Sequence, residues 1–230
     1  MDVAVIGGTG AEGFGLALRL AKAGHRVTIG SRDAGRGAEA AAKASELAGT
    51  PLEGTDNASA AAAPRADGVV AVTVPYAGQA EIYRSLKDAV AADAVVLDAT
   101  SPLATAVGGR PWQVLRPWHG SAAEQAQAIL GDGPRVVAGF HTIAAEGLQA
   151  LDREIDSDVL LCADDPAAKA RVGALIEGIP GMRWVDCGRL EMARVAEPLT
   201  ALLVSINRTY KVKDSGFRIV GRDAWGATGR

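Results

Sequence analysis

The first 22 residues constrain the fold more than any other stretch of the chain. A continuously apolar run at residues 3–6 leads into four glycines within seven residues, and a helix-forming segment follows at 14–22. Gly8, Gly10 and Gly13 match the pattern G-x-G-x-x-G between a buried strand and a helix. The glycines of this pattern permit a tight turn, close approach of backbone N–H groups to a pyrophosphate, and packing of helix on strand. Because a helix N-terminus attracts anions, this context predicts a dinucleotide site.

Strands and helices alternate along the rest of the chain, which predicts an α/β fold with a doubly wound, Rossmann-type parallel sheet. After the first strand, strands are expected at residues 26–29, 52–54, 69–74, 94–98 and 135–139, separated by helices at 14–22, 35–48, 58–63, 79–91 and 121–130. Two further strands, at 159–162 and 183–185, flank a helix at 166–177. The irregular stretch 102–117 is long enough to be functional.

We expect two parts, a nucleotide-binding Rossmann domain at residues 1–145 and a smaller C-terminal α/β portion at 146–230. Residues 190–210 are predicted to form the longest helix. Its apolar residues spread beyond one narrow stripe, which favours burial over much of its surface and a role at a dimer interface. The smaller portion would then form one wall of the acceptor pocket. The last residues, 223–230, are predicted to be disordered.

Composition narrows the class of protein. The hydrophobic content of 48% and the charged content of 22% are typical of globular proteins, and no apolar run is long enough for a membrane span. The start lacks the basic flank of a signal peptide, and Cys162 and Cys187 suit neither a disulfide framework nor a metal site. We therefore expect a cytoplasmic protein without a metal. Aromatic content of 4% and the lack of basic runs argue against nucleic acid as a partner.

The end of the second strand indicates which nucleotide is bound. An NAD site usually places Asp or Glu there to accept hydrogen bonds from the ribose 2′-hydroxyl. This chain has Gly30-Ser31-Arg32 instead, with Arg36 one helical turn further on. Ser31 can donate a hydrogen bond, and the arginines can pair with a 2′-phosphate. The sequence therefore predicts NADP.

Three later strand ends should meet at the same edge of the sheet and form the pocket for the second substrate. They carry Thr73-Val74-Pro75, Thr100-Ser101 and His141-Thr142-Ile143. His141 is the best placed of the three histidines, and we assign it to positioning of the acceptor. No residue is assigned as the acid–base catalyst. The lack of an obvious buried acid–base group favours hydride passing between two cofactors, with the protein supplying geometry.

Six segments together resemble one family. They are Gly7-Gly8-Thr9-Gly10, Gly30-Ser31-Arg32, Thr73-Val74-Pro75, Ser101-Pro102-Leu103, His141-Thr142-Ile143 and Glu197-Pro198-Leu199-Thr200. They are similar to those of the NADPH-dependent F420 reductases, which exchange hydride between NADP and a 5-deazaflavin coenzyme. The resemblance extends to about residue 221, and residues 205–219 look more like the bacterial branch. Where archaeal members have proline after His-Thr-Ile, this chain has Ala144.

The resemblance implies direct hydride transfer between nicotinamide C4 and deazaflavin C5, with NADP and coenzyme F420 as small-molecule partners and a homodimer as the assembly. By resemblance, Thr9, Ser31, Arg32 and Arg36 match NADP-binding positions, and His141 and Ile143 match positions near the deazaflavin. Residues 189–230 contain eight basic and four acidic residues, and the phosphate and glutamates of the deazaflavin tail would give this basic segment a ligand. The predicted cofactor-binding set is Gly8, Thr9, Gly10, Gly13, Ser31, Arg32, Arg36, Thr73, Val74, Pro75, Ser101, His141 and Ile143.

Two other functions remain open at this point. One is an NADP-dependent reductase of a small carbonyl, imine or metal-chelate substrate. The other is a sensor that binds NADP and regulates a partner without turnover.

Overall fold

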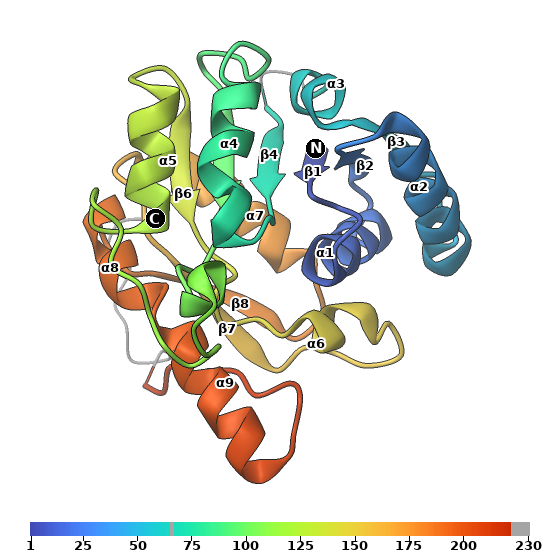
Figure 1. The fold of residues 1–230 in the computed structure, drawn as a ribbon. Coiled ribbons are helices and arrows are strands. Elements are labelled where there is room, and N and C mark those ends of the chain that lie inside the picture. The colour runs from blue at the N-terminus through green and yellow to red at the C-terminus, as the bar shows by residue number, and fades with distance from the viewer. Residues whose placement is uncertain (65–66, 222–230) are drawn as a thin grey trace.

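A six-stranded parallel sheet forms the centre of the molecule in this computed structural model, which describes residues 1–64 and 67–221 (Figure 1). Its strand order is β3-β2-β1-β4-β5-β6, and every neighbouring pair is parallel. The strands are β1 (Asp2–Ile6), β2 (Arg26–Ser31), β3 (Glu53–Asp56), β4 (Val69–Val72), β5 (Val95–Asp98) and β6 (Arg135–Ala138). From β1 the chain adds strands first on one side (β2, β3) and then on the other (β4, β5, β6). The crevice between β1 and β4, where this order switches, is where ligands bind in such folds. The predicted doubly wound sheet is confirmed.

Helices cover both faces of the sheet (Figure 1). One face carries α1 (Ala11–Lys22), α2 (Ala34–Ala48), α6 (Ala145–Gln149) and α7 (Pro166–Glu177), and the other carries α3 (Asn57–Ala62), α4 (Tyr76–Leu86) and α5 (Ala122–Leu130). In β1, Val3 and Val5 face the first group, whereas Ala4 and Ile6 face the second. The continuously apolar strands follow from this burial on both sides.

Side-chain caps fix where several helices begin. Asp33, Asp56, Ser121 and Asp165 each accept a hydrogen bond from a backbone N–H in the first turn of α2, α3, α5 and α7. Such caps satisfy N–H groups that have no acceptor within the helix. At α5 the sequence Ser121-Ala122-Ala123-Glu124 has the spacing of a capping box, but only half of the box forms. Ser121 accepts from the Glu124 N–H, but the Glu124 carboxylate pairs with Arg194 instead of reaching back.

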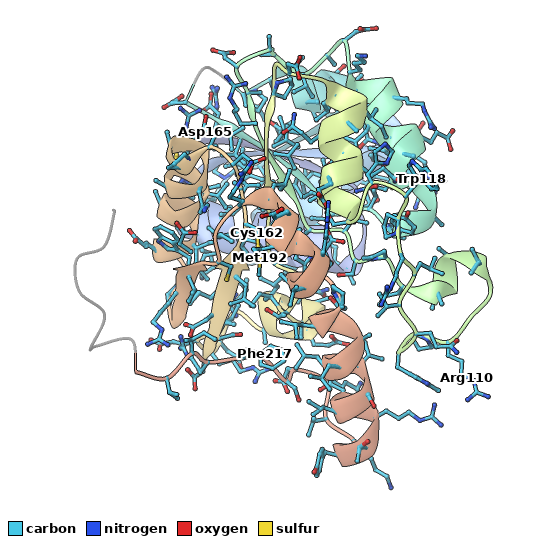
Figure 2. The ribbon with its side chains drawn as sticks, turned by 90° about the vertical axis from the view of Figure 1, so that its left-hand side faces the viewer. Arg110, Trp118, Cys162, Asp165, Met192 and Phe217 are labelled. Atoms are coloured by element: carbon cyan, nitrogen blue, oxygen red, sulfur yellow. The ribbon has the colours of Figure 1, made fainter. Side chains whose placement is uncertain are left out.

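The C-terminal portion adds a small parallel sheet of β7 (Ser157–Leu161) and β8 (Met182–Asp186), connected through α7. Asp158, on β7, accepts hydrogen bonds from Arg183, Arg218 and the backbone N–H of Ile219. These bonds hold the segment around Phe217 along β7 (Figure 2). The hydrophobic core on the α1 face is continuous with the apolar residues of β7 and α7. The two portions therefore share one core.

Arg19 also joins the two portions. Its side chain leaves α1 and donates hydrogen bonds to the carbonyl oxygens of Gly147 and Leu148, both at 2.9 Å, and to that of Ala150. The residue is only 5% exposed. Because α6 and the turn after it have few other partners for these carbonyls, the guanidinium fixes α6 against α1.

The predicted single helix at residues 190–210 is wrong. The chain instead forms a 3₁₀ turn (Leu190–Met192), α8 (Ala193–Ala196) and α9 (Leu199–Tyr210), and the longest helix is α2, with 15 residues. The break lies at Glu197 and Pro198, because the proline has no N–H to continue the helix and suits the start of a new one.

Burial over much of the surface of α9 is not seen within the single chain, and the predicted role at a dimer interface stays a prediction. Within α9, only Ala201 and Leu203 are buried, and the helix extends away from the sheet (Figure 1). The stretch 102–117, predicted to be irregular, contains a 3₁₀ turn (Ala104–Val107) and a bridge between Leu103 and Val114. No helix among the described residues is long and apolar enough to cross a membrane. The predicted disorder at 223–230 falls outside the described residues.

Candidate nucleotide and acceptor site

The turn after β1 has the form that a pyrophosphate site needs. Gly7 adopts a φ of +76°, so the left-handed residue of the tight turn is Gly7 and not a glycine of the motif itself. Gly8 packs against the Val5 carbonyl and Ile29, and Gly13 packs against Thr73 and Gly7. At Gly10 a Cβ would meet only the Gly7 carbonyl oxygen, at 3.3 Å. The exposed side of Gly10, with the free N–H groups at the start of α1, is therefore open to an anion.

The end of β2 carries the groups predicted to contact a 2′-phosphate. Ser31 is the last residue of β2 and is buried, whereas Arg32 and Arg36 are exposed. Asp33 caps α2 by accepting from the Arg36 N–H, so its carboxylate is occupied at the helix start. Among the described residues, neither arginine forms an ion pair. Both guanidinium groups are therefore available to an anionic ligand.

A cavity of about 580 Å³ lies at the carboxyl edge of the sheet, next to the glycine turn. Its walls come from five places: the start of α1, the residues after β4, the residues after β5, the turn after β6, and the first turn of α9. They include Gly10, Ala11, Glu12, Thr73, Val74, Pro75, Tyr76, Thr100, Ser101, Leu103, His141, Ile143 and Thr200. The structure thus brings the predicted Thr73, Ser101 and His141 segments together with the glycine turn.

The loops after β5 and β6 are linked to α9 by one chain of hydrogen bonds. The Thr200 hydroxyl donates to the His141 carbonyl oxygen at 2.6 Å, so the Ser101 hydroxyl, also at 2.6 Å, donates to Thr200. Thr200 lies in the first turn of α9. This small helix start therefore fixes the relative position of two walls of the cavity.

His141 lies in a constrained turn. Phe140 adopts a φ of +69°, a left-handed conformation that is rare for a bulky residue and that often marks functional sites. Within the described residues, neither imidazole nitrogen of His141 has a hydrogen-bond partner, and burial lowers its pKa to about 4. The ring is therefore neutral at physiological pH. A neutral ring can donate one hydrogen bond and accept another, which suits positioning of a polar ring edge.

Asp98 connects the end of β5 to α4 and to the loop that follows β5. It is fully buried at the end of β5 and accepts hydrogen bonds from the side chains of Gln79 and Tyr83, at 2.9 and 2.6 Å, and from the Thr100 N–H. Burial raises its pKa to about 6, and the hydrogen bonds oppose that shift. Asp98 therefore holds α4 and the start of the Thr100-Ser101 loop in place.

Sequence reasoning missed three polar residues of the site. Glu12 lines the cavity from the first turn of α1, and Thr200 does so from α9. Asn57, at the start of α3, is buried beside Gly30, and its Oδ1 has no hydrogen-bond partner in the described part of the chain. The spacing of Glu12 within the glycine pattern was a usable signal. Thr200 lies in the segment Glu197-Pro198-Leu199-Thr200, which carried part of the family resemblance. Asn57 offered no signal, because only the tertiary fold brings it near.

These features fit a dinucleotide. The open side of Gly10, the unpaired Arg32 and Arg36, and the unpartnered polar atoms of Asn57 and His141 all lie along the edge where such ligands bind. The fold and the site therefore define a Rossmann-type protein of the nicotinamide-nucleotide-binding class.

Comparison with known proteins narrows this class. Residues 2–102 match the family described as NADP oxidoreductase, coenzyme F420-dependent. The chain is 43% identical to an F420-dependent NADP reductase of Methanothermobacter thermautotrophicus, over 95% of this chain and 94% of that protein. It is 39% identical to one of Methanocaldococcus jannaschii, over 95% and 98% of the two chains. The chain belongs to the F420-dependent NADP reductase family.

Solved structures agree on the fold. A crystal structure of a putative F420-dependent NADP reductase from an Arthrobacter species superposes with a TM-score of 0.79 at 24% identity, covering 95% of this chain and 98% of that one. A 3-hydroxyisobutyrate dehydrogenase of Mycobacterium tuberculosis superposes with a TM-score of 0.62 at 15% identity, covering 91% and 62%.

Proposed function

We propose that this protein is an oxidoreductase that transfers hydride directly between NADP(H) and the 5-deazaflavin coenzyme F420. One observation carries the proposal: a single cavity is lined both by the glycine turn and by the loops after β4, β5 and β6. A nicotinamide ring and a second flat ring can share a space of that kind. Membership in the F420-dependent NADP reductase family supports this assignment of both ligands. Nicotinamide and deazaflavin supply the redox chemistry, and the protein supplies their alignment.

The predicted cofactor-binding residues divide into three groups in this proposal. The glycine turn, with Thr9, holds the pyrophosphate. Ser31, Arg32 and Arg36 hold the 2′-phosphate. Thr73, Val74, Pro75, Ser101, His141 and Ile143 border the two reacting rings. Among the described residues no arginine or lysine lines this cavity, whereas Glu12 does, so a small anionic substrate is poorly suited to it.

A direct assay tests the choice of acceptor. Purified protein is mixed with NADPH and oxidised F420, and the visible absorbance of the deazaflavin is followed. Loss of that absorbance, with equal consumption of NADPH, is expected. Consumption of NADPH only with small carbonyls or imines would contradict the proposal in favour of a different reductase. Binding without turnover of any acceptor would point to a sensor.

Arg32→Ala tests the choice of nucleotide. A charge-assisted hydrogen bond contributes about 1.5–3 kcal/mol, so its loss should raise the KM for NADPH by about tenfold or more and leave that for NADH nearly unchanged. Lys43→Ala, at an exposed position of α2, provides a matched loss of charge away from the end of β2. Equal losses for NADPH and NADH in Arg32→Ala would refute the 2′-phosphate assignment.

We further propose that residues 1–145 bind NADP and that residues 146–230 form the acceptor wall and a homodimer interface. Several large apolar side chains of the second portion are exposed, and Trp118 on the preceding loop is 97% exposed. The exposed members are Met192, Val195, Leu202, Tyr210, Val212 and Val220. Figure 2 shows Trp118 and Arg110 on the loop between β5 and α5. Light scattering on the wild-type protein and on Leu202→Glu tests this, since a dimer should dissociate in the variant.

The basic groups near that loop suit an anionic tail of the acceptor. The Arg208 guanidinium on α9 lies 4.4 Å from the ring centre of Trp112, and that of Arg110 lies 5.5 Å from it. These contacts connect α9 to the loop after β5. We propose that this cluster contacts the phosphate and glutamates of the deazaflavin tail. Arg208→Ala should then raise the KM for F420 more than that for NADPH.

A further inference from the structure

Glu12 is the feature of the cavity that the proposed reaction does not yet use. It lies in the first turn of α1, directly before Gly13, which packs against Thr73 at the end of β4. Glu12 lines the same cavity as Ser101 and His141, whereas Arg32, at the end of β2, does not line it. Glu12 therefore faces the end of the site where the reactive ring of a nucleotide would lie, and not the adenosine end.

The carboxyl of Glu12 has no partner of opposite charge. Among the described residues it takes part in no hydrogen bond or ion pair, and no lysine or arginine lines the cavity. Burial raises its pKa to about 8, and the negative charge of Asp98 raises it further. An acidic residue in the first turn of a helix ordinarily gains from the helix dipole, so a raised pKa argues against a simple stabilising role.

The other titratable groups around Glu12 do not compensate its charge. Tyr76 on α4 and His141 after β6 line the cavity, and both are neutral at physiological pH because burial raises the pKa of the first and lowers that of the second. Asp98 on β5 is acidic, and Glu146 on the adjoining α6 is acidic and exposed. A carboxylate in such surroundings gains most from a cationic ligand.

NADP⁺ and NADPH differ in the charge of the nicotinamide ring. The pyridinium ring of NADP⁺ carries a positive charge, whereas the dihydropyridine ring of NADPH is neutral. We propose that the Glu12 carboxylate stabilises the pyridinium ring, so that Glu12 sets the difference in affinity between NADP⁺ and NADPH. This inference rests on the proposed binding of NADP(H). A neighbouring pyrophosphate would repel the carboxylate equally in both forms, so it does not affect the difference.

Binding of NADP⁺ and NADPH is measured by calorimetry between pH 6 and 9, on the wild type, Glu12→Gln and Glu146→Gln. In the wild type, NADP⁺ should bind more tightly as the pH rises through about 8, where the free carboxyl ionises. NADPH should not follow this trend. The 2′-phosphate titrates near pH 6 in both nucleotides, and its effect cancels in the ratio of their Kd values.

In Glu12→Gln at pH 9, the Kd for NADP⁺ should rise about tenfold and that for NADPH by less than twofold. The ratio should become independent of pH. By linkage, the midpoint potential of the bound couple should rise by about 30 mV, since a tenfold change corresponds to 29.6 mV for two electrons. Glu146→Gln, which removes a charge of the same type on the exposed side of α6, should leave the ratio unchanged.

Equal changes in both Kd values, or no change in either, would overturn the inference. Glu12→Asp guards against a mere packing effect, because it should retain the pH dependence of NADP⁺ binding. Failure of the wild type to bind either nucleotide would refute the proposed function itself, whereas normal binding with an unchanged ratio in Glu12→Gln would refute only the role of Glu12.

Discussion

Replacing Arg19 tests whether α6 is held in place by one buried cation. Arg19→Met keeps the apolar part of the side chain but removes every donor to the carbonyl oxygens of Gly147, Leu148 and Ala150. A hydrogen bond from a charged group contributes about 1.5 kcal/mol at the lower end of its range. Loss of three such bonds is therefore expected to lower the free energy of unfolding by about 4.5 kcal/mol. That is a large share of the roughly 5–15 kcal/mol that stabilises a typical domain.

The same substitution at Arg26 provides the control. Arg26 pairs with Asp2 at the surface, and its side chain is 53% exposed, so Arg26→Met should cost less than about 1 kcal/mol. Guanidinium chloride unfolding, followed by far-ultraviolet circular dichroism, measures both changes. Arg19→Lys should lie between the two, because lysine keeps the charge but not the planar fork that reaches three carbonyls. Equal destabilisation by Arg19→Met and Arg26→Met would refute the reasoning.

Two further substitutions probe the glycine turn and the C-terminal segment. In Gly13→Ala the new Cβ would collide with Thr73 Oγ1 and would lie 2.8 Å from the Gly7 carbonyl oxygen, so nucleotide affinity should fall at least about tenfold by calorimetry. Gly78→Ala is the control: its Cβ would meet no atom within 4 Å, so nucleotide affinity should be unchanged and the free energy of unfolding should be equal or slightly higher. At Asp158 burial raises the carboxyl pKa, but hydrogen bonds from Arg183, the Ile219 N–H and Arg218 outweigh it and lower the pKa to about 2. The native state therefore favours the charged form, and Asp158→Asn should cost about 2 kcal/mol of unfolding free energy above pH 5, a difference that disappears as the pH falls through 2. A cost independent of pH would contradict this.

Local sequence signals predicted most of the sheet. The apolar run at 3–6 and the glycines after it correspond to β1, the turn and α1, and Pro166–Glu177 forms the predicted helix. These elements are recognisable because their sequence signals are local. Burial on both faces requires a continuous apolar run, a tight turn requires glycine, and a helix start favours a capping side chain. The tight turn itself is centred on Gly7, one residue before the motif glycines.

Long-range contacts explain what the sequence did not predict. The helix expected at 190–210 breaks at Pro198, and the Glu197 carboxylate next to the break accepts from the N–H groups of Ala122 and Ala123, more than seventy residues away. The sequence shows that Glu12 is acidic. It does not show that the carboxyl lies near Asp98 without a cation to balance its charge, because that depends on how α1 packs against β5. The predicted site residues of the loops after β4, β5 and β6 do converge on one cavity, because parallel strands end at one edge.

The Arg19 contacts also decide where this chain can be divided. The acceptors for its guanidinium lie at residues 147–150, just beyond the boundary at 145. A protein truncated at residue 145 would lose every carbonyl oxygen that accepts from the guanidinium and would expose the apolar face of α1 that packs against α6 and α7. Recombination with another nucleotide-binding fold should therefore take its junction after residue 150, so that α1 and α6 are inherited together.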